Sequence, residues 1–446
     1  MARATRARKA ALAVLGEVRR RNARARDLLR GSDALMRLDE RDRAFATRLV
    51  LGTTAALGLL DSLVDARLRR GKLEPKVRDA LRMATYELLF LSTPASIAVS
   101  QGVELARLAS PRSAGLANAV LRRISLEEVP HRQEVLGRVE REELQPDDLS
   151  LASGYPSWLL SRIQRDRGAE VALDLAMAAL DPAPVYVAAN EATVSAGEAR
   201  DLLEKAGLCP QRAEESGAFV LRNPAGLFSC GLVQDAFVVV ADLSAQRVVR
   251  LVAPSVDARV LEVGQGRATK TVLLCNTASR AGARVSVVGV DVEGFKVEVA
   301  RERMLRAGLA ERVRCVQCDA RLLDTTERIP EEARGEFDLV FVDAPCSGTG
   351  TLRRHPEISW SLTEDGLDEL VCLQRSILKA SAARVAKGGV LAYATCSVLA
   401  AENEEVVRSF LRSEEGSAFR LLSNTFQSFP RRGEPDGHFC ARLIRS

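Results

Sequence analysis

The sequence is poor in aromatic residues and contains no long apolar run. Aromatics make up 4% of its 446 residues, too few for a protein that stacks many bases of a single-stranded nucleic acid on aromatic side chains. No run reaches the roughly eighteen apolar residues of a membrane-spanning helix, so no membrane association is expected. The N-terminus also lacks the apolar core of a secretion signal, which predicts a cytoplasmic protein.

Histidine is scarce, and the cysteines do not form a framework. The chain has three histidines and nine cysteines at irregular spacings. An odd number of cysteines without a secretion signal favours reduced thiols over disulfides. Cys315 and Cys318 form a CxxC motif, but a second CxxC is missing and the residues before Asp319 are typical of a strand. Zinc or redox chemistry at this motif is therefore disfavoured, and no metal site is expected.

Positive charge is concentrated at the N-terminus. The net charge is +5, whereas the first thirty residues hold ten Lys or Arg against two acidic residues. This local excess exceeds that of the whole chain. A basic face suggests a polyanionic partner such as RNA, and a solvated helix face is the alternative on composition alone.

The length of the chain predicts two or three domains. Residues 1–126 place apolar side chains at spacings of three and four, which predicts a helical domain. Residues 127–172 are rich in charge at their start and predict a linker with some helix. Short strand-like runs and one helix predict a small α+β subdomain over 173–250. Residues 251–446 alternate strands and helices, which predicts a Rossmann-like α/β domain.

Acidic residues end the strand patterns of this last domain. Asp291, Asp319 and Asp343 each follow an apolar run, and ligands bind at the carboxyl ends of such strands. The first strand is followed by Glu262-x-Gly264-x-Gly266, whose glycines let backbone approach a ligand closely. Asp291 is placed to bind ribose hydroxyls and Asp319 to meet the adenine side. Alone, these features fit NAD as well as S-adenosylmethionine.

Two further strands would each bring a cysteine to the same edge. Cys346 lies in Asp343-Ala-Pro-Cys-Ser-Gly-Thr-Gly, directly after the run at 339–342. Cys396 lies in Thr-Cys-Ser, directly after the run at 389–394. A single free cysteine is more often a small apolar side chain than a nucleophile. Two such loops favour a function for both thiols.

Together these loops carry a resemblance to a known family. The runs DAPCSGTG and RRHPEISW, followed by YATCSVLAAENEEVV, resemble the RNA (cytosine-5) methyltransferases. The runs KLEPKVRDALRMATYELLFL and GLANAVLRR resemble the NusB-like RNA-binding domain. The combination is similar to the bacterial small-subunit (16S) rRNA (cytosine-5) methyltransferases of the RsmB/Sun type. It implies an all-α NusB-like bundle, a small α+β subdomain and a Rossmann-like class I S-adenosylmethionine methyltransferase domain.

The resemblance also implies roles for individual residues. Cys396 would be the nucleophile that adds to carbon 6 of cytosine, Cys346 would assist product release, and Asp343 would bind the base. The cofactor would be S-adenosylmethionine rather than NAD. The residues expected at the cofactor are Glu262, Gly264, Gln265, Gly266, Arg267, Lys270, Asp291, Asp319 and Asp343.

The cofactor loop departs from the family pattern. Where the family has Cys-Ala-Ala-Pro-Gly-Gly-Lys-Thr, this chain has Gly264-Gln-Gly-Arg-Ala-Thr-Lys-Thr271. Lys270 and Thr271 are kept, but the proline and the glycine pair are not. Arg267 is a new cation that either holds the methionine carboxylate or points to water. We expect cofactor binding with changed contacts.

The expected substrate is 16S rRNA in an unassembled or partly assembled subunit, because the cytosine must be unstacked to react. Arg353, Arg354 and His355 either contact phosphates or form a solvated basic turn. A monomer is expected. Two other functions are considered: a catalytically weakened paralogue that acts as an RNA-binding or ribosome assembly protein, and a DNA cytosine methyltransferase. The second cysteine loop and the helical N-terminus argue against the latter.

Overall fold

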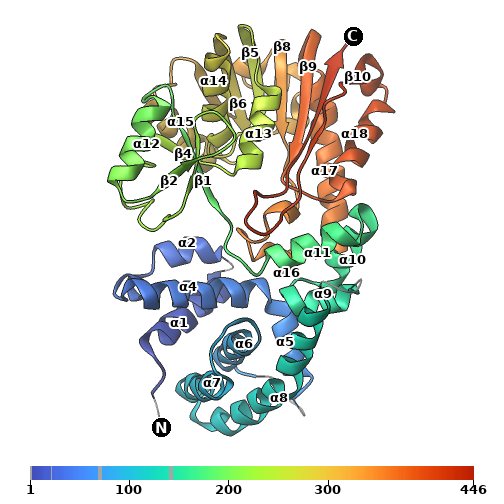
Figure 1. The fold of residues 1–446 in the computed structure, drawn as a ribbon. Coiled ribbons are helices and arrows are strands. Elements are labelled where there is room, and N and C mark those ends of the chain that lie inside the picture. Colours follow the sequence, from blue (N-terminus) through green and yellow to red (C-terminus); the bar gives the residue numbers. More distant parts are fainter. Residues whose placement is uncertain (1–2, 22, 69–72, 140–143) are drawn as a thin grey trace. The chain divides into compact units, whose positions relative to one another are not determined.

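The protein folds into two compact units, and each is described by itself (Figure 1). The structure is a computed structural model that describes residues 3–21, 23–68, 73–139 and 144–446. Unit 1 comprises Met1–Pro182 and Leu352–Thr363, and unit 2 comprises Ala183–Thr351 and Glu364–Ser446.

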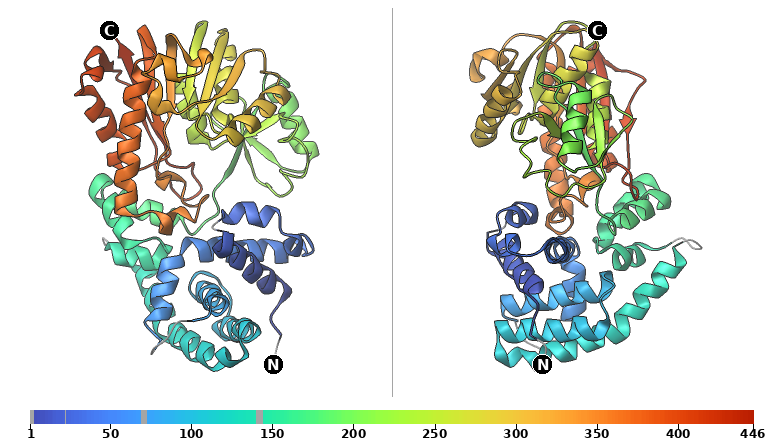
Figure 2. Two further views of the ribbon diagram at one scale, coloured as in Figure 1. Left: turned by 180° about the vertical axis from the view of Figure 1, so that it is seen from behind. Right: turned by 60° about the vertical axis from the view of Figure 1, so that its left-hand side comes forward.

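Unit 1 is helical, as the sequence predicted for its N-terminal part. Its α-helices are α1 (Arg6–Arg21), α2 (Ala25–Arg30), α3 (Asp33–Met36), α4 (Glu40–Ala55), α5 (Leu57–Asp65), α6 (Pro75–Phe90), α7 (Ala95–Ala109), α8 (Ala114–Arg138), α9 (Pro146–Ser153), α10 (Ser157–Arg167), α11 (Ala169–Ala178) and α16 (Ile358–Ser361). Helix α6 lies between α4, α7 and α8 (Figures 1 and 2), and its Leu81 and Met83 are fully buried. Pro75 at its first position suits a helix start, where an N–H is not needed.

Within the described residues, no single helix has the length and apolar composition to span a membrane. The bent pair α4 and α5, which meet at 75°, reaches both only when taken together. Both helices bury leucines, Leu49 and Leu60, in the core of unit 1.

Helix α8 extends into the stretch that the sequence predicted as a linker. It continues through Pro130 to Arg138, while residues 140–143 of that stretch lie outside the described part of the chain. Arg132 anchors this part of the helix, because its buried guanidinium donates to three backbone carbonyls of α6 and α9 at 2.7–3.2 Å. A charged residue thus fixes the packing of this helix, which a polar composition does not indicate.

A short segment late in the sequence, residues 352–363, folds with unit 1. The indole Nε1 of Trp360 donates to the carbonyls of Ala55 at 2.7 Å and Gly154 at 3.1 Å. A Cβ atom at Gly58 would lie 2.1 Å from the Trp360 ring, so the ring lies directly on the Gly58 backbone. The chain therefore enters unit 1 immediately after Thr351 and leaves it at Thr363.

Unit 2 begins with the small α+β element that the sequence predicted. Strands β1 (Val185–Ala189), β2 (Pro210–Arg212), β3 (Ala218–Leu221) and β4 (Val238–Val240) form an antiparallel sheet in the order β2-β3-β1-β4. Helix α12 (Ala196–Lys205) starts with a capping box formed by Ser195 and Glu198. Its Leu203 packs with Val187 and Phe219 in a small core of its own.

The larger sheet of unit 2 has the predicted Rossmann-like architecture. Its strands are β5 (Ala258–Val263), β6 (Val285–Asp291), β7 (Val313–Gln317), β8 (Phe337–Asp343), β9 (Val385–Thr395), β10 (Phe419–Leu421), β11 (Phe426–Gln427) and β12 (Phe439–Arg445). The intervening α-helices are α13 (Leu243–Val252), α14 (Thr269–Arg280), α15 (Gly294–Arg306), α17 (Glu364–Ala382) and α18 (Glu404–Leu411). Strands β5 to β9 are parallel, and β12 is antiparallel to β9.

The order of these strands decides where a ligand binds. The sheet runs β10-β12-β9-β8-β5-β6-β7, so the chain order reverses between β5 and β8. Open α/β sheets bind ligands in the crevice outside such a switch point. The glycine loop after β5 and the Cys346 loop after β8 both start there.

Candidate active site

The loop after β5 is held tightly against its neighbours. Gly264 has a φ of +80°, and a Cβ on it would lie 2.3 Å from the Asp343 carbonyl oxygen. Only glycine suits that combination of conformation and space. The Oδ2 atom of Asp291 accepts a hydrogen bond of 3.0 Å from the Gly266 amide. The acid that ends β6 therefore shapes the loop as well as bordering it.

Two residues predicted to bind the cofactor place their side chains beneath this loop. Glu262 is 1% exposed and accepts a bond of 2.5 Å from the Thr271 hydroxyl, and burial raises its pKa to about 7. Gln265 donates to the same hydroxyl at 3.1 Å. A Cβ at Gly289 would lie 2.0 Å from the Gln265 amide nitrogen. Gln265, which stands where the family pattern has an alanine, thus fills space left free by a glycine of β6.

Arg267 and Asp319, which were also predicted to bind the cofactor, differ in the contacts that they already make. Arg267 is exposed, and its carbonyl accepts a bond of 3.0 Å from Arg303. Asp319, after β7, accepts a bond of 2.6 Å from the Arg321 guanidinium, and this bond holds the pKa of the Asp319 carboxyl below its usual range. Asp319 is therefore held in a close ion pair, whereas Asp291 borders the glycine loop and lies 3.8 Å from Lys296.

The two cysteines predicted at the sheet edge lie side by side. Their Sγ atoms are 3.2 Å apart, and the Cys396 amide lies 3.3 Å from the Cys346 sulfur. The pairing of β8 with β9 contributes to this, because Asp343 is opposite Ala394 and the cysteines follow three residues after Asp343 and two residues after Ala394. The hydrogen bond from Cys346 lowers the pKa of Cys396 and raises that of Cys346. Cys396 is therefore the thiol that ionises first.

A cation stands next to this thiol pair. The Nζ atom of Lys270, in the first turn of α14, lies 2.7 Å from Oδ2 of Asp343. Burial lowers the pKa of Lys270, but the Asp343 carboxylate and the Cys396 thiolate outweigh it, so that the pKa is raised overall. The positive charge in turn lowers the pKa of Cys396. Lys270, Asp343 and Cys396 were predicted from the sequence as site residues, whereas the Lys270–Asp343 ion pair was not.

The three residues predicted to bind RNA lie in the segment that folds with unit 1. Arg353, Arg354 and His355 are partly exposed. The carbonyl of Arg354 accepts a bond of 2.5 Å from Arg26, and His355 Nδ1 lies 3.8 Å from Glu357 Oε1. A contact of these residues with RNA stays a prediction.

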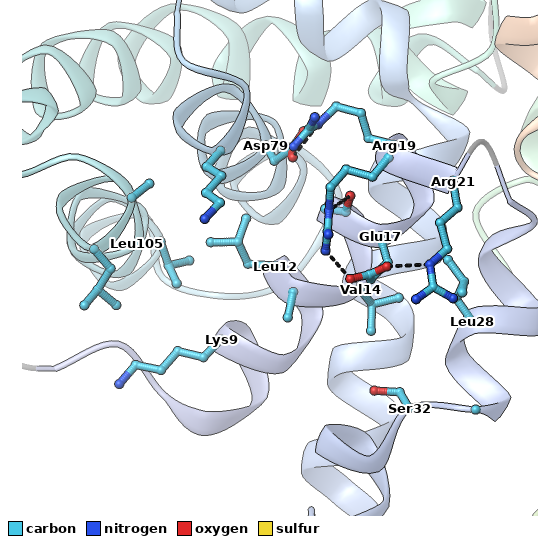
Figure 3. Close-up of a pocket in the computed structure, with 17 residues that line it drawn as sticks. Lys9, Leu12, Val14, Glu17, Arg19, Arg21, Leu28, Ser32, Asp79 and Leu105 are labelled. Carbon is cyan, nitrogen blue, oxygen red and sulfur yellow. Dashed lines mark hydrogen bonds and ion pairs between the residues drawn. The ribbon is translucent and has the colours of Figure 1, made fainter.

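Unit 1 also carries a pocket of about 490 Å³ on its basic N-terminal helix (Figure 3). Five cationic side chains line it: Lys9, Arg19, Arg20, Arg21 and Lys76. Asp79 pairs with Arg19 at 3.0 Å, and Glu17 pairs with Arg21 at 2.7 Å and with Arg20. Within the part of the chain that the structure describes, Lys9 and Lys76 form no ion pair. Leu12, Val14 and Leu105 add an apolar surface.

The CxxC motif has the surroundings of a buried structural pair. Burial raises the pKa of the Cys315 thiol to about 11, and it also raises that of Cys318. Among the described residues, no group of three or more His, Cys, Asp or Glu side chains is arranged to hold a metal ion. Thiolate chemistry is therefore favoured at Cys396 rather than at this motif.

Comparison with known proteins identifies both parts of the chain. Residues 249–444 match the family "16S rRNA methyltransferase RsmB/F", and residues 5–126 match the NusB family. The Ribosomal RNA small subunit methyltransferase B of Serratia proteamaculans (strain 568) is 30% identical over 419 residues, 92% of each chain. The protein of the same name from Escherichia coli O139:H28 (strain E24377A / ETEC) is 30% identical over 420 residues, again 92% of each.

Solved structures agree on the fold. The crystal structure of PH0851 matches 99% of both chains with a TM-score of 0.77 at 22% identity. The structure of NSun6 from Pyrococcus horikoshii with SFG matches 66% of this chain and 99% of that one, with a TM-score of 0.56 at 16% identity. The match to the curated relatives extends over both units. The chain therefore belongs to the RsmB/F family of 16S rRNA methyltransferases.

Proposed function

We propose that this protein transfers a methyl group from S-adenosylmethionine to carbon 5 of a cytosine in 16S rRNA, through a covalent bond between Cys396 and carbon 6. The observation that carries this proposal is the thiol pair, whose sulfur atoms lie 3.2 Å apart at the ends of adjacent parallel strands. Family membership supplies the reaction class. The two sulfurs and their unequal pKa values support the choice of carbon 5.

The glycine loop fits S-adenosylmethionine, the cofactor of this family. Gly264 and Gly266 present backbone without side chains beside the switch point, and Asp291 ends the neighbouring strand where ribose hydroxyls are bound in such folds. Lys270 supplies a partly exposed cation. When bound, the cofactor supplies an electrophilic methyl group. Gln265, which replaces an alanine of the family pattern, faces the core and not this backbone surface.

The protein's own groups account for the remaining steps. Carbon 5 of cytosine is a weak nucleophile until the Cys396 thiolate bonds to carbon 6 and makes the ring an enamine. After methyl transfer a base removes the proton on carbon 5, the carbon 6–sulfur bond breaks, and the thiolate leaves. Cys346 keeps a protonated thiol beside the departing sulfur and assists release. Asp343 would accept a hydrogen bond from the cytosine amine, with Lys270 holding its carboxylate.

The decisive experiment is methylation of unmodified 16S rRNA with labelled S-adenosylmethionine, followed by bisulfite sequencing. We expect label in the RNA and one cytosine that becomes resistant to deamination, with free rRNA a better substrate than the assembled subunit. Label at another atom would contradict the choice of carbon 5. No label, combined with no cofactor binding in calorimetry, would instead support the RNA-binding paralogue.

We propose that the pocket of unit 1 also binds the RNA. Lys9 and Lys76 are exposed, and an RNA phosphate fits such cations. We expect the double substitution Lys9→Glu and Lys76→Glu to weaken rRNA binding and to reduce the slope of log affinity against log salt by about 1–2. A filter-binding titration at several salt concentrations measures both quantities.

The matched control changes the same amount of charge elsewhere. Lys205 and Lys387 are exposed residues of unit 2. The double variant Lys205→Glu, Lys387→Glu should retain a steeper salt dependence of rRNA affinity than the double variant Lys9→Glu, Lys76→Glu. Equal losses of affinity in both double variants would mean that net charge matters and the pocket does not.

A further inference from the structure

A buried carboxylate lies beneath both cysteine loops. Glu402, at the end of a short 3-10 helix after β9, is 0% exposed. Its Oε1 atom accepts hydrogen bonds from the Ser347 amide at 2.7 Å and from Gln374 at 2.9 Å. Its Oε2 atom accepts bonds of 2.5 Å from the hydroxyls of Ser347 and Ser397. One side chain thus takes four hydrogen bonds from three residues.

Two of these donors directly follow the two cysteines in sequence. Ser347 comes after Cys346, and Ser397 comes after Cys396. We propose that Glu402 is a positioning residue that ties the two cysteine loops together and sets the separation of their thiols. This role rests on the proposed function, in which both thiols take part in one reaction. No role for Glu402 was predicted from the sequence, although it lies in the run YATCSVLAAENEEVV, six residues after Cys396.

Residues around Glu402 add further hydrogen bonds to Glu402 and to the two cysteine loops. Gln374 of α17 uses its amide for a second bond, 2.9 Å to the Pro345 carbonyl, on the other side of Cys346. Tyr393 donates a bond of 2.7 Å to the Glu402 carbonyl. Asn403 donates a bond of 2.9 Å to the Ser397 carbonyl. Both cysteine loops are therefore fixed on either side of Glu402, by α17 and by β9.

The electrostatics favour a geometric role over an activating one. Among the described residues Glu402 forms no ion pair, so its burial is offset by hydrogen bonds alone. Its charge acts to raise the pKa of both Cys346 and Cys396, against Lys270, which lowers that of Cys396. A group that existed to activate the nucleophile would act in the opposite direction. Two carboxylate oxygens, however, accept four donors at once, which a single amide or hydroxyl oxygen does not.

Two substitutions separate the hydrogen bonds of Glu402 from the effect of its negative charge. Glutamine keeps the size of Glu402, and the two serine hydroxyls can rotate to accept from its amide. For Glu402→Gln we expect kcat within about tenfold of wild type and a pH profile displaced to lower pH, because the neighbouring thiols ionise more easily. The groups that face Cys396 in this profile are Cys346, Lys270, Asp343 and Glu402. Glu402→Ala removes the tie, and we expect kcat to fall about 100-fold, the effect of a misplacement near 1 Å. The KM for S-adenosylmethionine should not change.

A readout independent of methylation measures the thiol pair itself. The reagent diamide takes two electrons and two protons from a pair of thiols, which become a disulfide while the reagent becomes a hydrazine. We expect fast formation of a Cys346–Cys396 disulfide in wild type and in Glu402→Gln, and formation at least tenfold slower in Glu402→Ala. Peptide mass spectrometry distinguishes this bond from those of the exposed thiols Cys209, Cys230 and Cys372.

The outcomes distinguish this role from the proposed function. If wild type methylates an atom other than carbon 5 while the diamide rates follow the expected order, the proposed function fails and the tie stands. Equal diamide rates in all three proteins would overturn the tie. Loss of kcat in Glu402→Gln as large as in Glu402→Ala would also overturn it, since the charge would then be what matters. If Glu402→Ala does not fold, Ser347→Ala and Ser397→Ala test the same bonds. Each should slow the disulfide, and wild-type rates in both would contradict the proposal.

Discussion

Replacing Cys396 by alanine is expected to abolish methylation of 16S rRNA, with a loss on the order of 10⁴-fold or more, the range seen when a catalytic nucleophile is removed. Cys396 has the lowered pKa of the thiol pair, and without its sulfur carbon 5 is not activated. Incorporation of label from S-adenosylmethionine into the RNA measures the loss. Cys372→Ala, an exposed cysteine of α17, is the control and should retain wild-type activity.

Replacing Cys346 should block the last step of the reaction, product release, and leave the first step, attack by Cys396, intact. Cys396 still bonds to carbon 6 in Cys346→Ala, but the thiol that assists release is missing. We expect a covalent protein–RNA complex that survives denaturing electrophoresis. The double variant Cys346→Ala, Cys396→Ala should form none. A complex that persists in the double variant, or methylation that survives Cys396→Ala, would show that another residue is the nucleophile.

Replacing Lys270 by methionine is expected to lower kcat/KM at neutral pH by about 10²–10³, the range for loss of one preorganised charged group in an active site. Two effects combine. Asp343 loses the cation 2.7 Å from its carboxylate, and the pKa of Cys396 rises because the Lys270 charge no longer lowers it. Thiolate is lost as pH falls through the pKa of Cys396, so a raised pKa makes the loss greatest at low pH. Activity should therefore recover in part as pH rises.

The pH dependence of iodoacetamide alkylation at Cys396 tests this independently of methylation. The alkylation midpoint should move to higher pH in Lys270→Met and remain near that of wild type in Lys270→Arg, which keeps the charge. Lys387, an exposed residue near the start of β9, provides the surface control, as Lys387→Met. An unchanged midpoint in Lys270→Met would mean that the cation acts on Asp343 alone.

The features that the sequence could predict are those that depend on local pattern and on strand order. Strands β8 and β9 were recognisable as apolar runs, and each delivers its cysteine directly after its last residues. Parallel pairing of Asp343 with Ala394 then places both cysteine loops at the same ends of neighbouring strands. The acid at the end of β6 was predictable for the same reason, because position at a strand end decides its place at the sheet edge.

Side-chain contacts between distant segments were not predictable in the same way. Gln265 looked like a changed cofactor contact, but it turns into space left by Gly289, and only the packed structure reveals that pairing. Lys270 and Asp343 were each assigned to the site, while their ion pair depends on the first turn of α14 lying over the end of β8. Arg132 is charged, a property typical of exposed residues, yet it is buried. Its three carbonyl partners come from other helices, so the sequence around Arg132 does not reveal them.

The Trp360 anchor has a consequence for the order in which the protein is made. The residue lies 206 positions after Gly154, one of its two hydrogen-bond partners. At a synthesis rate of 5–20 residues per second, roughly 10–40 s separate the two on the ribosome. Throughout that interval the surface over Gly58 has no indole to cover it. The first domain to emerge is thus completed only after strands β5 to β8 of the other unit have been translated.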